Sequence, residues 1–155
     1  YMGTNDYGHE TPMGTINDTE DVSFYGALNV IISGIQKAQP DAKLVWITPT
    51  HRYGFGTSKL LGTAFTYDYL PNGRGYSLND YVDAIKEVCD KYDIPVIDLF
   101  TLSGMDPSLS EVRTQYMPDG LHPNAAGHEK IAAVIAKELT NIVICIPGNE
   151  NHQDS

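Results

Sequence analysis

The chain has 155 residues, a length that fits one domain built around a single hydrophobic core. Hydrophobic residues make up 41% and charged residues 19%, and no apolar run approaches the roughly 18 to 20 residues that a membrane-spanning helix needs. Twenty acidic against ten basic side chains give a formal net charge of -10, so the surface repels polyanions and nucleic acid is not an expected partner.

The first half of the chain predicts one helix, one strand and one long loop. Residues 21–38 carry apolar side chains at helical spacing behind an acidic front, which the helix dipole favours. Residues 44–47 are a short apolar run stopped by Pro49, typical of a parallel strand buried on both faces. Residues 51–76 hold five glycines and no sustained period, so they predict a long loop or a small hairpin.

The second half repeats the alternation. Ser77 opens a predicted helix with Asp80 in a capping-box position, and residues 94–99 predict a second short strand. Asn124 is expected to cap a third helix. Short buried strands that alternate with amphipathic helices indicate an α/β fold around a parallel sheet. We expect one domain over residues 1–146 and a polar tail over residues 147–155.

Three polar side chains stand where a parallel sheet places its ligand site, after the ends of strands. Asp119 and His122 lie three residues apart on a loop that enters a helix, where the carboxylate can hold one ring nitrogen and orient the base. Asn5 follows Gly3 in a predicted turn, and its amide can donate to a developing oxyanion. Together they suggest acyl-transfer chemistry.

These residues resemble a known family. Gly3-Thr4-Asn5-Asp6 is similar to the GxND block of the SGNH, or GDSL-type, hydrolases, and Asp119-Gly120-Leu121-His122-Pro123 is similar to their DxxHP block. The resemblance implies a flavodoxin-like three-layer α/β/α sandwich. It also implies that Asn5 donates to the oxyanion hole, His122 is the general base towards a serine, and Asp119 orients His122.

The chain departs from the family pattern at its front. The turn that bears the nucleophilic serine and the glycine block of the oxyanion hole both precede GxND in the family, and neither is found here. We therefore expect the carboxyl-terminal part of such a hydrolase, with a fold incomplete at the N-terminus and residues 2–3 ending its third strand. The serine would come from a missing N-terminal segment or an associated chain. Without it the chain should be inactive, with apolar helix residues such as Val22, Tyr25 and Ile32 uncovered.

The polar, tyrosine-rich loops favour short acyl groups, above all O-acetyl esters of carbohydrate, as substrates. That substrate would fit secreted or cell-surface action. A lysophospholipase or thioesterase is the alternative within the family, and a catalytically silent carbohydrate-binding or assembly module is the alternative outside catalysis. Retention of the asparagine, aspartate and histidine favours an enzyme, since a silent module has no physical need for them.

Further candidates carry weaker signals. His51, Arg52 and Tyr7 are candidate substrate contacts, although a solvated loop histidine is a competing interpretation of His51. Tyrosines 67, 69 and 76 could form the floor of a substrate groove or pack inside the protein. Four ligands for a metal would have to converge from three loops without a short-spaced pair, so no metal and no cofactor is expected. Cys89 is predicted to be a core residue, and the sequence does not decide whether it forms a disulfide with Cys145.

Overall fold

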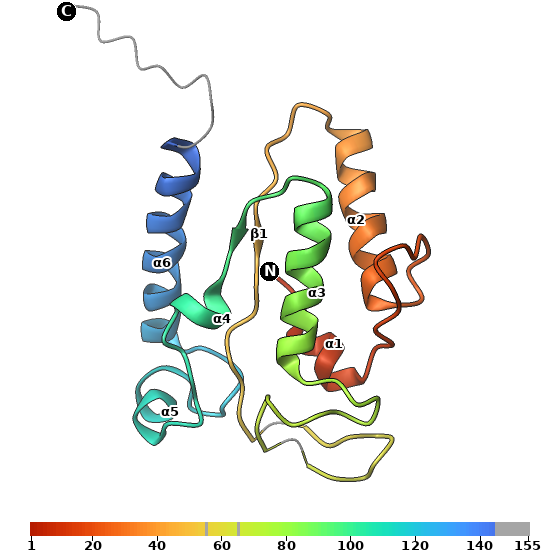
Figure 1. Cartoon of the computed structure of the whole chain (residues 1–155). Helices are drawn as coiled ribbons and strands as arrows, with labels where there is room; N and C mark the ends of the chain where they lie inside the picture. Colours follow the sequence, from red (N-terminus) through yellow and green to blue (C-terminus); the bar gives the residue numbers. More distant parts are fainter. Residues whose placement is uncertain (55, 65, 145–155) are drawn as a thin grey trace, which may run out of the picture.

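The computed structural model describes residues 1–54, 56–64 and 66–144. Strands β1 (Trp46–Ile47) and β2 (Val96–Ile97) pair in parallel, and the helices are α1 (Thr4–His9), α2 (Phe24–Ala38), α3 (Leu78–Lys91), α4 (Leu99–Leu102), α5 (Ser110–Tyr116) and α6 (Ala125–Ile144). Figure 1 shows α2 and α3 on one side of the strands and α6 on the other. This confirms the α/β fold with helices on both faces of a small parallel sheet.

Alternate residues of the strands pack into two separate cores, one on each face of the sheet. Trp46 and Val96, which are register partners, pack against the cluster formed by α1, α2 and α3. The next pair, Ile47 and Ile97, belongs to the cluster formed with α6. Successive side chains of a strand point to opposite faces, so two residues of each strand suffice to join three layers.

Local capping sets where the predicted helices begin. Helix α2 begins at Phe24 rather than at residue 21, because the Ser23 side-chain oxygen accepts a hydrogen bond from the backbone N–H of Gly26 at 3.2 Å and so caps the helix. The capping box of α3 is present as expected, with Ser77 and Asp80 bonded to each other's backbone.

Both strands are shorter than the apolar runs that predict them. The second run, residues 94–99, ends its strand at Ile97 because the Asp98 side chain accepts from the backbone N–H of Thr101 at 3.3 Å and starts α4. The expected strand end at residues 2–3 is not found: Gly3, at φ 118°, is instead the residue that precedes α1. Asn5 therefore sits in a short helix, not in a free turn.

The apolar face of α2 is better covered than the sequence suggests. Ile32 is fully buried against the α3 side of the core, so the expectation of an uncovered Ile32 is wrong, whereas Val22 is 70% exposed and Tyr25 is half-buried. The half-buried apolar side chains next to the second core lie on β1, the residue before it, the end of α5 and α6: Val45, Ile47, Tyr116, Val134, Ile135 and Ile142.

The described residues of the segment 51–76 form the predicted hairpin excursion. Two isolated antiparallel bridges join Tyr53 to Tyr67 and Thr57 to Ala64. Figure 1 places this segment at the same end of the molecule as α1. It is attached there by Glu10, whose buried carboxylate accepts hydrogen bonds from the backbone N–H groups of Lys59 at 3.0 Å, Leu60 at 3.1 Å and Gly73 at 2.9 Å, and from the Ser58 hydroxyl.

In the described part of the chain, no helix is both long and apolar enough to cross a membrane. Cys89 is buried on α3, as expected, and burial raises the pKa of its thiol to about 11. Cys145 and the predicted polar tail lie outside the described residues.

Candidate functional site

The turn at residues 119–122 is organised by its own aspartate. One carboxylate oxygen of Asp119 accepts hydrogen bonds from the backbone N–H groups of Leu121 at 2.8 Å and His122 at 2.7 Å. The other oxygen lies 2.6 Å from Nδ1 of His122. The histidine ring is thereby held by a carboxylate at Nδ1, the arrangement that fixes a catalytic imidazole in one tautomer.

The electrostatics of this pair favour an ionised aspartate. Partial burial works against the charge of Asp119, but the hydrogen bonds from the backbone and side chain of His122 and from the backbone of Leu121 outweigh it and lower the pKa of the carboxyl to about 2. An ionised Asp119 can stabilise the imidazolium that forms when His122 takes up a proton.

Asn5 and the histidine turn meet at one cavity. Asn5 is exposed in the first turn of α1 and lines a cavity of about 200 Å³ together with Gly8, His9, Arg52, Lys59 and Leu121. Leu121 is the neighbour of His122 in the turn. The structure therefore brings residues of both sequence blocks, 3–6 and 119–123, to the lining of the same cavity, although the blocks lie far apart in the chain.

Arg52, at the start of the hairpin, connects it to α1. Its side chain is 5% exposed, its Nη1 donates to the carbonyl oxygen of Thr4 at 2.8 Å, and its guanidinium carbon lies 5.4 Å from the ring centre of Tyr7. Thr4 directly precedes Asn5, so Arg52 holds the backbone on which the candidate oxyanion donor is carried.

His51 belongs to a second histidine–aspartate pair that the sequence did not reveal. Its Nδ1 lies 2.8 Å from Oδ2 of Asp68, and the same oxygen accepts from the backbone N–H of Arg52 at 3.0 Å. The ring also packs on Phe100 with 3.8 Å between centroids. His51 is half-buried and paired, so the alternative of a solvated loop histidine is wrong.

This second pair lines a further cavity of about 360 Å³. Arg52 belongs to its lining as well, so the two cavities share that side chain; other lining residues are Tyr67, Tyr69, Asn79, Asp106 and Ser108. Asp68 could not be found from local spacing, because it stands 17 residues from His51 and meets it only through the hairpin.

Tyr7, the third candidate substrate contact, lies in the core. It is fully buried, and its hydroxyl donates to the carbonyl oxygens of Leu70 at 3.0 Å and Tyr67 at 3.3 Å. Its role in the structure is to attach the hairpin to α1, and we assign it no contact with substrate.

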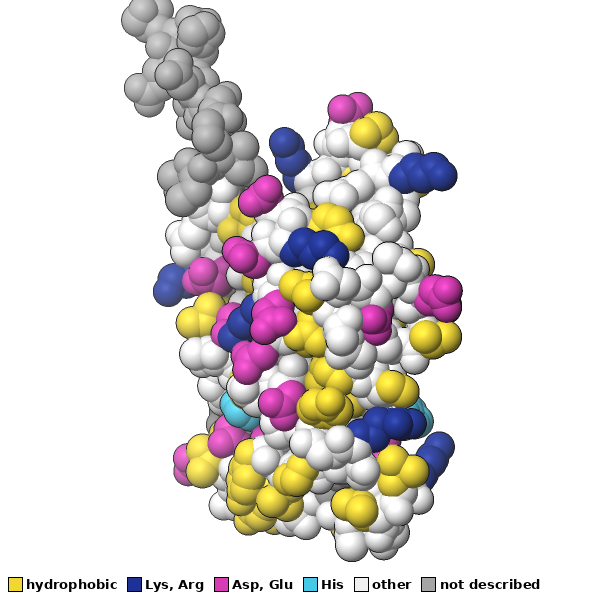
Figure 2. All heavy atoms as spheres, turned by 45° about the vertical axis from the view of Figure 1, so that its right-hand side comes forward, with side chains coloured by type: hydrophobic (Ala, Val, Ile, Leu, Met, Phe, Trp, Pro, Cys, Tyr) yellow, Lys and Arg dark blue, Asp and Glu magenta, His cyan; other side chains and the backbone are white. Residues whose placement is uncertain are grey.

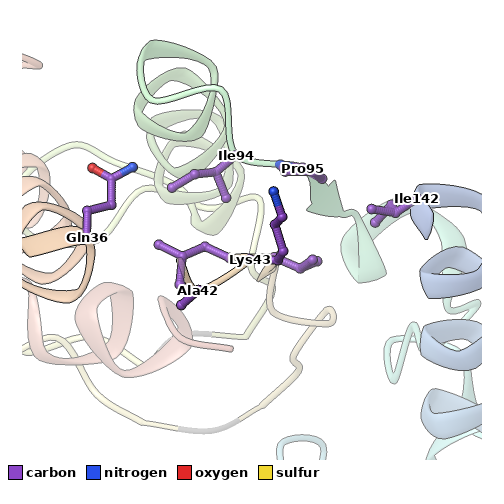
Figure 3. A pocket seen from close by; sticks show the side chains of 8 residues that line it. Gln36, Ala42, Lys43, Ile94, Pro95 and Ile142 are labelled. Carbon is purple, nitrogen blue, oxygen red and sulfur yellow. The ribbon is translucent and has the colours of Figure 1, made fainter. Parts of the chain in front are cut away.

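A third cavity, of about 190 Å³, opens at the opposite end of the strands. Figure 3 shows Ile94, Pro95 and Ile142 around it, with Lys43 and Gln36 nearby. Lys43 and Pro95 precede β1 and β2, so this cavity lies at the amino ends of the strands, away from Asn5 and His122. Among the described residues, no group of three or more histidine, cysteine, aspartate or glutamate side chains could hold a metal ion.

The site thus combines a histidine–aspartate pair in the turn before α6 with an asparagine in α1, the residue types of a general base, its orienting carboxylate and an oxyanion donor. The chain belongs to the GDSL-like lipase/acylhydrolase family, whose model matches residues 1–130. Among curated proteins, the comparison gives no match.

Solved structures agree with the family. One shares 39% identity with a TM-score of 0.80, and the match covers 90% of this chain and 62% of that one. A protein from Lactobacillus plantarum shares 34% identity with a TM-score of 0.80, covering 90% of this chain and 64% of its own. A protein from Chitinophaga pinensis, described as a possible lipase, shares 25% identity with a TM-score of 0.67, covering 92% of this chain and 71% of its own. The chain thus spans less than two thirds of the first two structures.

Proposed function

We propose that this chain is the carboxyl-terminal part of a serine esterase in which His122 is the general base and acid, Asp119 orients it, and Asn5 donates to the oxyanion. The observation that carries the proposal is the shared cavity: Asn5 lines it beside Leu121, one residue from a histidine whose Nδ1 lies 2.6 Å from a carboxylate. The oxyanion donor and the turn that bears the base thus border one space in which an ester carbonyl could sit.

The reaction would proceed in two stages, formation of an acyl-enzyme and its hydrolysis. The hydroxyl oxygen of a serine attacks the ester carbonyl while His122 takes the hydroxyl proton, and the resulting oxyanion accepts a hydrogen bond from the Asn5 amide. The carbon–oxygen bond to the alcohol then breaks, and His122 returns the proton to the departing alcohol. A water molecule repeats the sequence on the acyl-enzyme, which releases the carboxylic acid and restores the serine.

The attacking serine would come from a segment that precedes residue 1 in the complete protein or from an associated chain. Two observations support this. The chain spans 62% and 64% of two similar structures, and half-buried apolar side chains such as Ile47 and Val134 border the α6 side of the sheet, where further strands could pack. We expect the 155-residue chain alone not to hydrolyse esters.

Short acyl groups, in particular O-acetyl groups on carbohydrate, are the proposed substrate. The cavity beside Asn5 measures about 200 Å³, which suits a small acyl group better than a long alkyl chain. Polar side chains such as Asn5, Thr57 and Lys59 line it, and they suit a hydroxylated alcohol.

Long-chain esters are the second candidate. Figure 2 shows hydrophobic side chains gathered at the lower end of the molecule, where the hairpin of residues 51–76 lies. In that segment Leu60 is 57% exposed and Leu61 is 59% exposed, next to Lys59 at the rim of the cavity. Exposed leucines beside a site can receive an acyl chain or a lipid surface.

A panel of p-nitrophenyl esters from acetate to palmitate, hydrolysed by the complete protein, tests the proposal. We expect the highest kcat/KM for acetate and loss of turnover in His122→Ala. A clear preference for long chains would replace the short-acyl proposal by the lipase alternative. Absence of turnover on every ester would favour the non-catalytic module.

A further inference from the structure

We propose that the cavity lined by Arg52, Tyr69, Asn79, Asp106 and Ser108 is a binding subsite for one uncharged sugar ring of the substrate. This inference rests on the proposed esterase function and specifies the alcohol part of its substrate.

The position links this cavity, called here the sugar subsite, to the chemistry. Arg52 lines both the sugar subsite and the cavity that contains Asn5. A ligand in the sugar subsite is therefore one side chain away from the proposed oxyanion donor. An ester oxygen on that ligand could extend past Arg52 towards Asn5, while the ring stays behind in the larger space.

An exposed aromatic ring stands at the edge of the sugar subsite. Tyr69 stacks on Tyr67 with 4.9 Å between centroids and an interplanar angle of 22°, and Tyr67 in turn meets the ring of Tyr53 at 5.1 Å. Stacking uses one face of Tyr69, yet the residue is 65% exposed. The other face is thus available to the apolar C–H side of a sugar ring, and the stack behind it is already ordered before a ligand arrives.

Polar groups of three kinds complete the lining. The Asn79 amide has an accepting oxygen and one further N–H beside the one that donates to Asp83 at 2.8 Å, the Asp106 carboxylate accepts, and the Ser108 hydroxyl does either. The turn that carries two of them is held by a hydrogen bond from the backbone N–H of Ser108 to Oδ1 of Asp106 at 2.9 Å. Sugar hydroxyls require this mixture of donors and acceptors around an apolar face.

The sugar subsite carries charged side chains of both signs. Asp68 and Asp106 are its acidic lining residues, and Arg52 is a permanent cation. Burial disfavours the charged form of His51, but the hydrogen bond to Asp68 and the charges of Asp68 and Asp106 outweigh it and raise the pKa of its imidazole. The lining thus carries two carboxylates together with an arginine and an imidazole whose charged form these carboxylates favour, and this mixture of signs favours an uncharged ligand over an anion or a cation.

The volume also fits a ring. About 360 Å³ lies at the small end of the range for small-molecule pockets, a size that suits a single sugar ring.

Binding and kinetics on the complete protein test the proposal. In saturation-transfer NMR, methyl β-D-glucopyranoside or methyl β-D-xylopyranoside should bind. Tyr69→Ala should weaken that binding and lower the ratio of kcat/KM for the acetylated glycoside to kcat/KM for p-nitrophenyl acetate, each by about tenfold. Tyr76→Ala is the matched control, because Tyr76 is also an exposed tyrosine of the hairpin and does not line the subsite.

The outcomes separate this inference from the proposed function. Hydrolysis of p-nitrophenyl acetate with an equal ratio in both tyrosine variants would overturn the sugar subsite and leave the esterase proposal standing. Glycoside binding that depends on Tyr69, without any ester hydrolysis, would support the subsite and contradict the esterase. Tighter binding of glucose 6-phosphate than of the neutral glycosides would overturn the uncharged ligand class.

Discussion

Gly120, in the turn that carries the candidate base, accepts a hydrogen bond at its carbonyl oxygen from the backbone N–H of Tyr53 at 2.8 Å. A side chain at Gly120, whose φ is +81°, would overlap the carbonyl oxygen of Tyr53. The Asp119–His122 turn therefore docks on the hairpin through a contact between two backbones, and only glycine permits it.

Gly120→Ala should disturb this docking. We expect a loss of about 2 to 4 kcal/mol in the free energy of unfolding, from left-handed strain plus overlap with Tyr53. Gly62→Ala is the control, because Gly62 has a similar φ of +68° but nothing within 4 Å of an added Cβ, and it should cost about 1 kcal/mol. Urea unfolding measures both, and equal losses would show that the contact is unimportant.

Removal of the catalytic groups should have graded effects on the complete protein. His122→Ala should lower kcat by several orders of magnitude, because base and nucleophile act as one unit. Asn5→Ala should cost about 10²- to 10³-fold, the usual effect of one oxyanion donor. Steady-state kinetics on p-nitrophenyl acetate gives both numbers, and near-normal turnover in His122→Ala would refute the assignment.

Asp119 should make stability depend on acid pH. Its carboxyl pKa is lowered from 3.8 to about 2 in the folded state, so its stabilising effect is present above pH 4 and is lost as the pH falls towards 2. The difference in unfolding free energy between wild type and Asp119→Asn should be largest above pH 4 and shrink on acidification. A difference that stays constant from pH 6 to pH 2 would contradict the lowered pKa.

A substitution at Gly8 tests whether Arg52 positions Asn5. An added Cβ at Gly8 would lie 2.8 Å from Nη1 of Arg52, so Gly8→Ala should push the guanidinium away from the Thr4 carbonyl and shift Asn5. We expect kcat to fall about tenfold with little change in KM. Gly34→Ala, on α2 with open space around its Cβ, is the control and should leave kcat unchanged. Equal kcat in both variants would contradict the role.

Glu10 should stabilise the hairpin through its charge. Glu10→Gln replaces an oxygen that accepts several N–H groups by an amide that donates, so we expect a loss of about 2 to 3 kcal/mol and faster proteolysis within residues 58–74. Glu20→Gln changes the same charge at an exposed position and serves as control. Indistinguishable proteolysis of the two variants would argue against this attachment.

Local sequence was sufficient for features that depend on neighbours in the chain. Capping by Ser77 and Asn124 and the Asp119–His122 pair all involve residues three apart, so spacing alone predicts them. The strand ends were less predictable, because the competing start of α4 at Asp98 ended the second strand early.

Contacts across the hairpin could not be predicted. Glu10 looks like an ordinary solvated acid in the sequence, and its donors lie about fifty and more residues further along the chain. Sequence alone does not separate a tyrosine at a binding site from a tyrosine in the core, and only tertiary packing shows that Tyr7, a predicted substrate contact, is buried. The pairing of His51 with Asp68 could not be predicted for the same reason, because only the folded hairpin brings the two residues together.

The most direct test of the central claim is to label the complete protein with a fluorophosphonate, which reacts with an activated serine, and to map the adduct by mass spectrometry. We predict one modified serine outside the 155 residues, and loss of labelling in His122→Ala and a strong reduction in Asn5→Ala. A modified serine within these residues, or labelling that persists in His122→Ala, would contradict the assignment of this chain as the base-bearing and oxyanion-bearing part of a serine esterase.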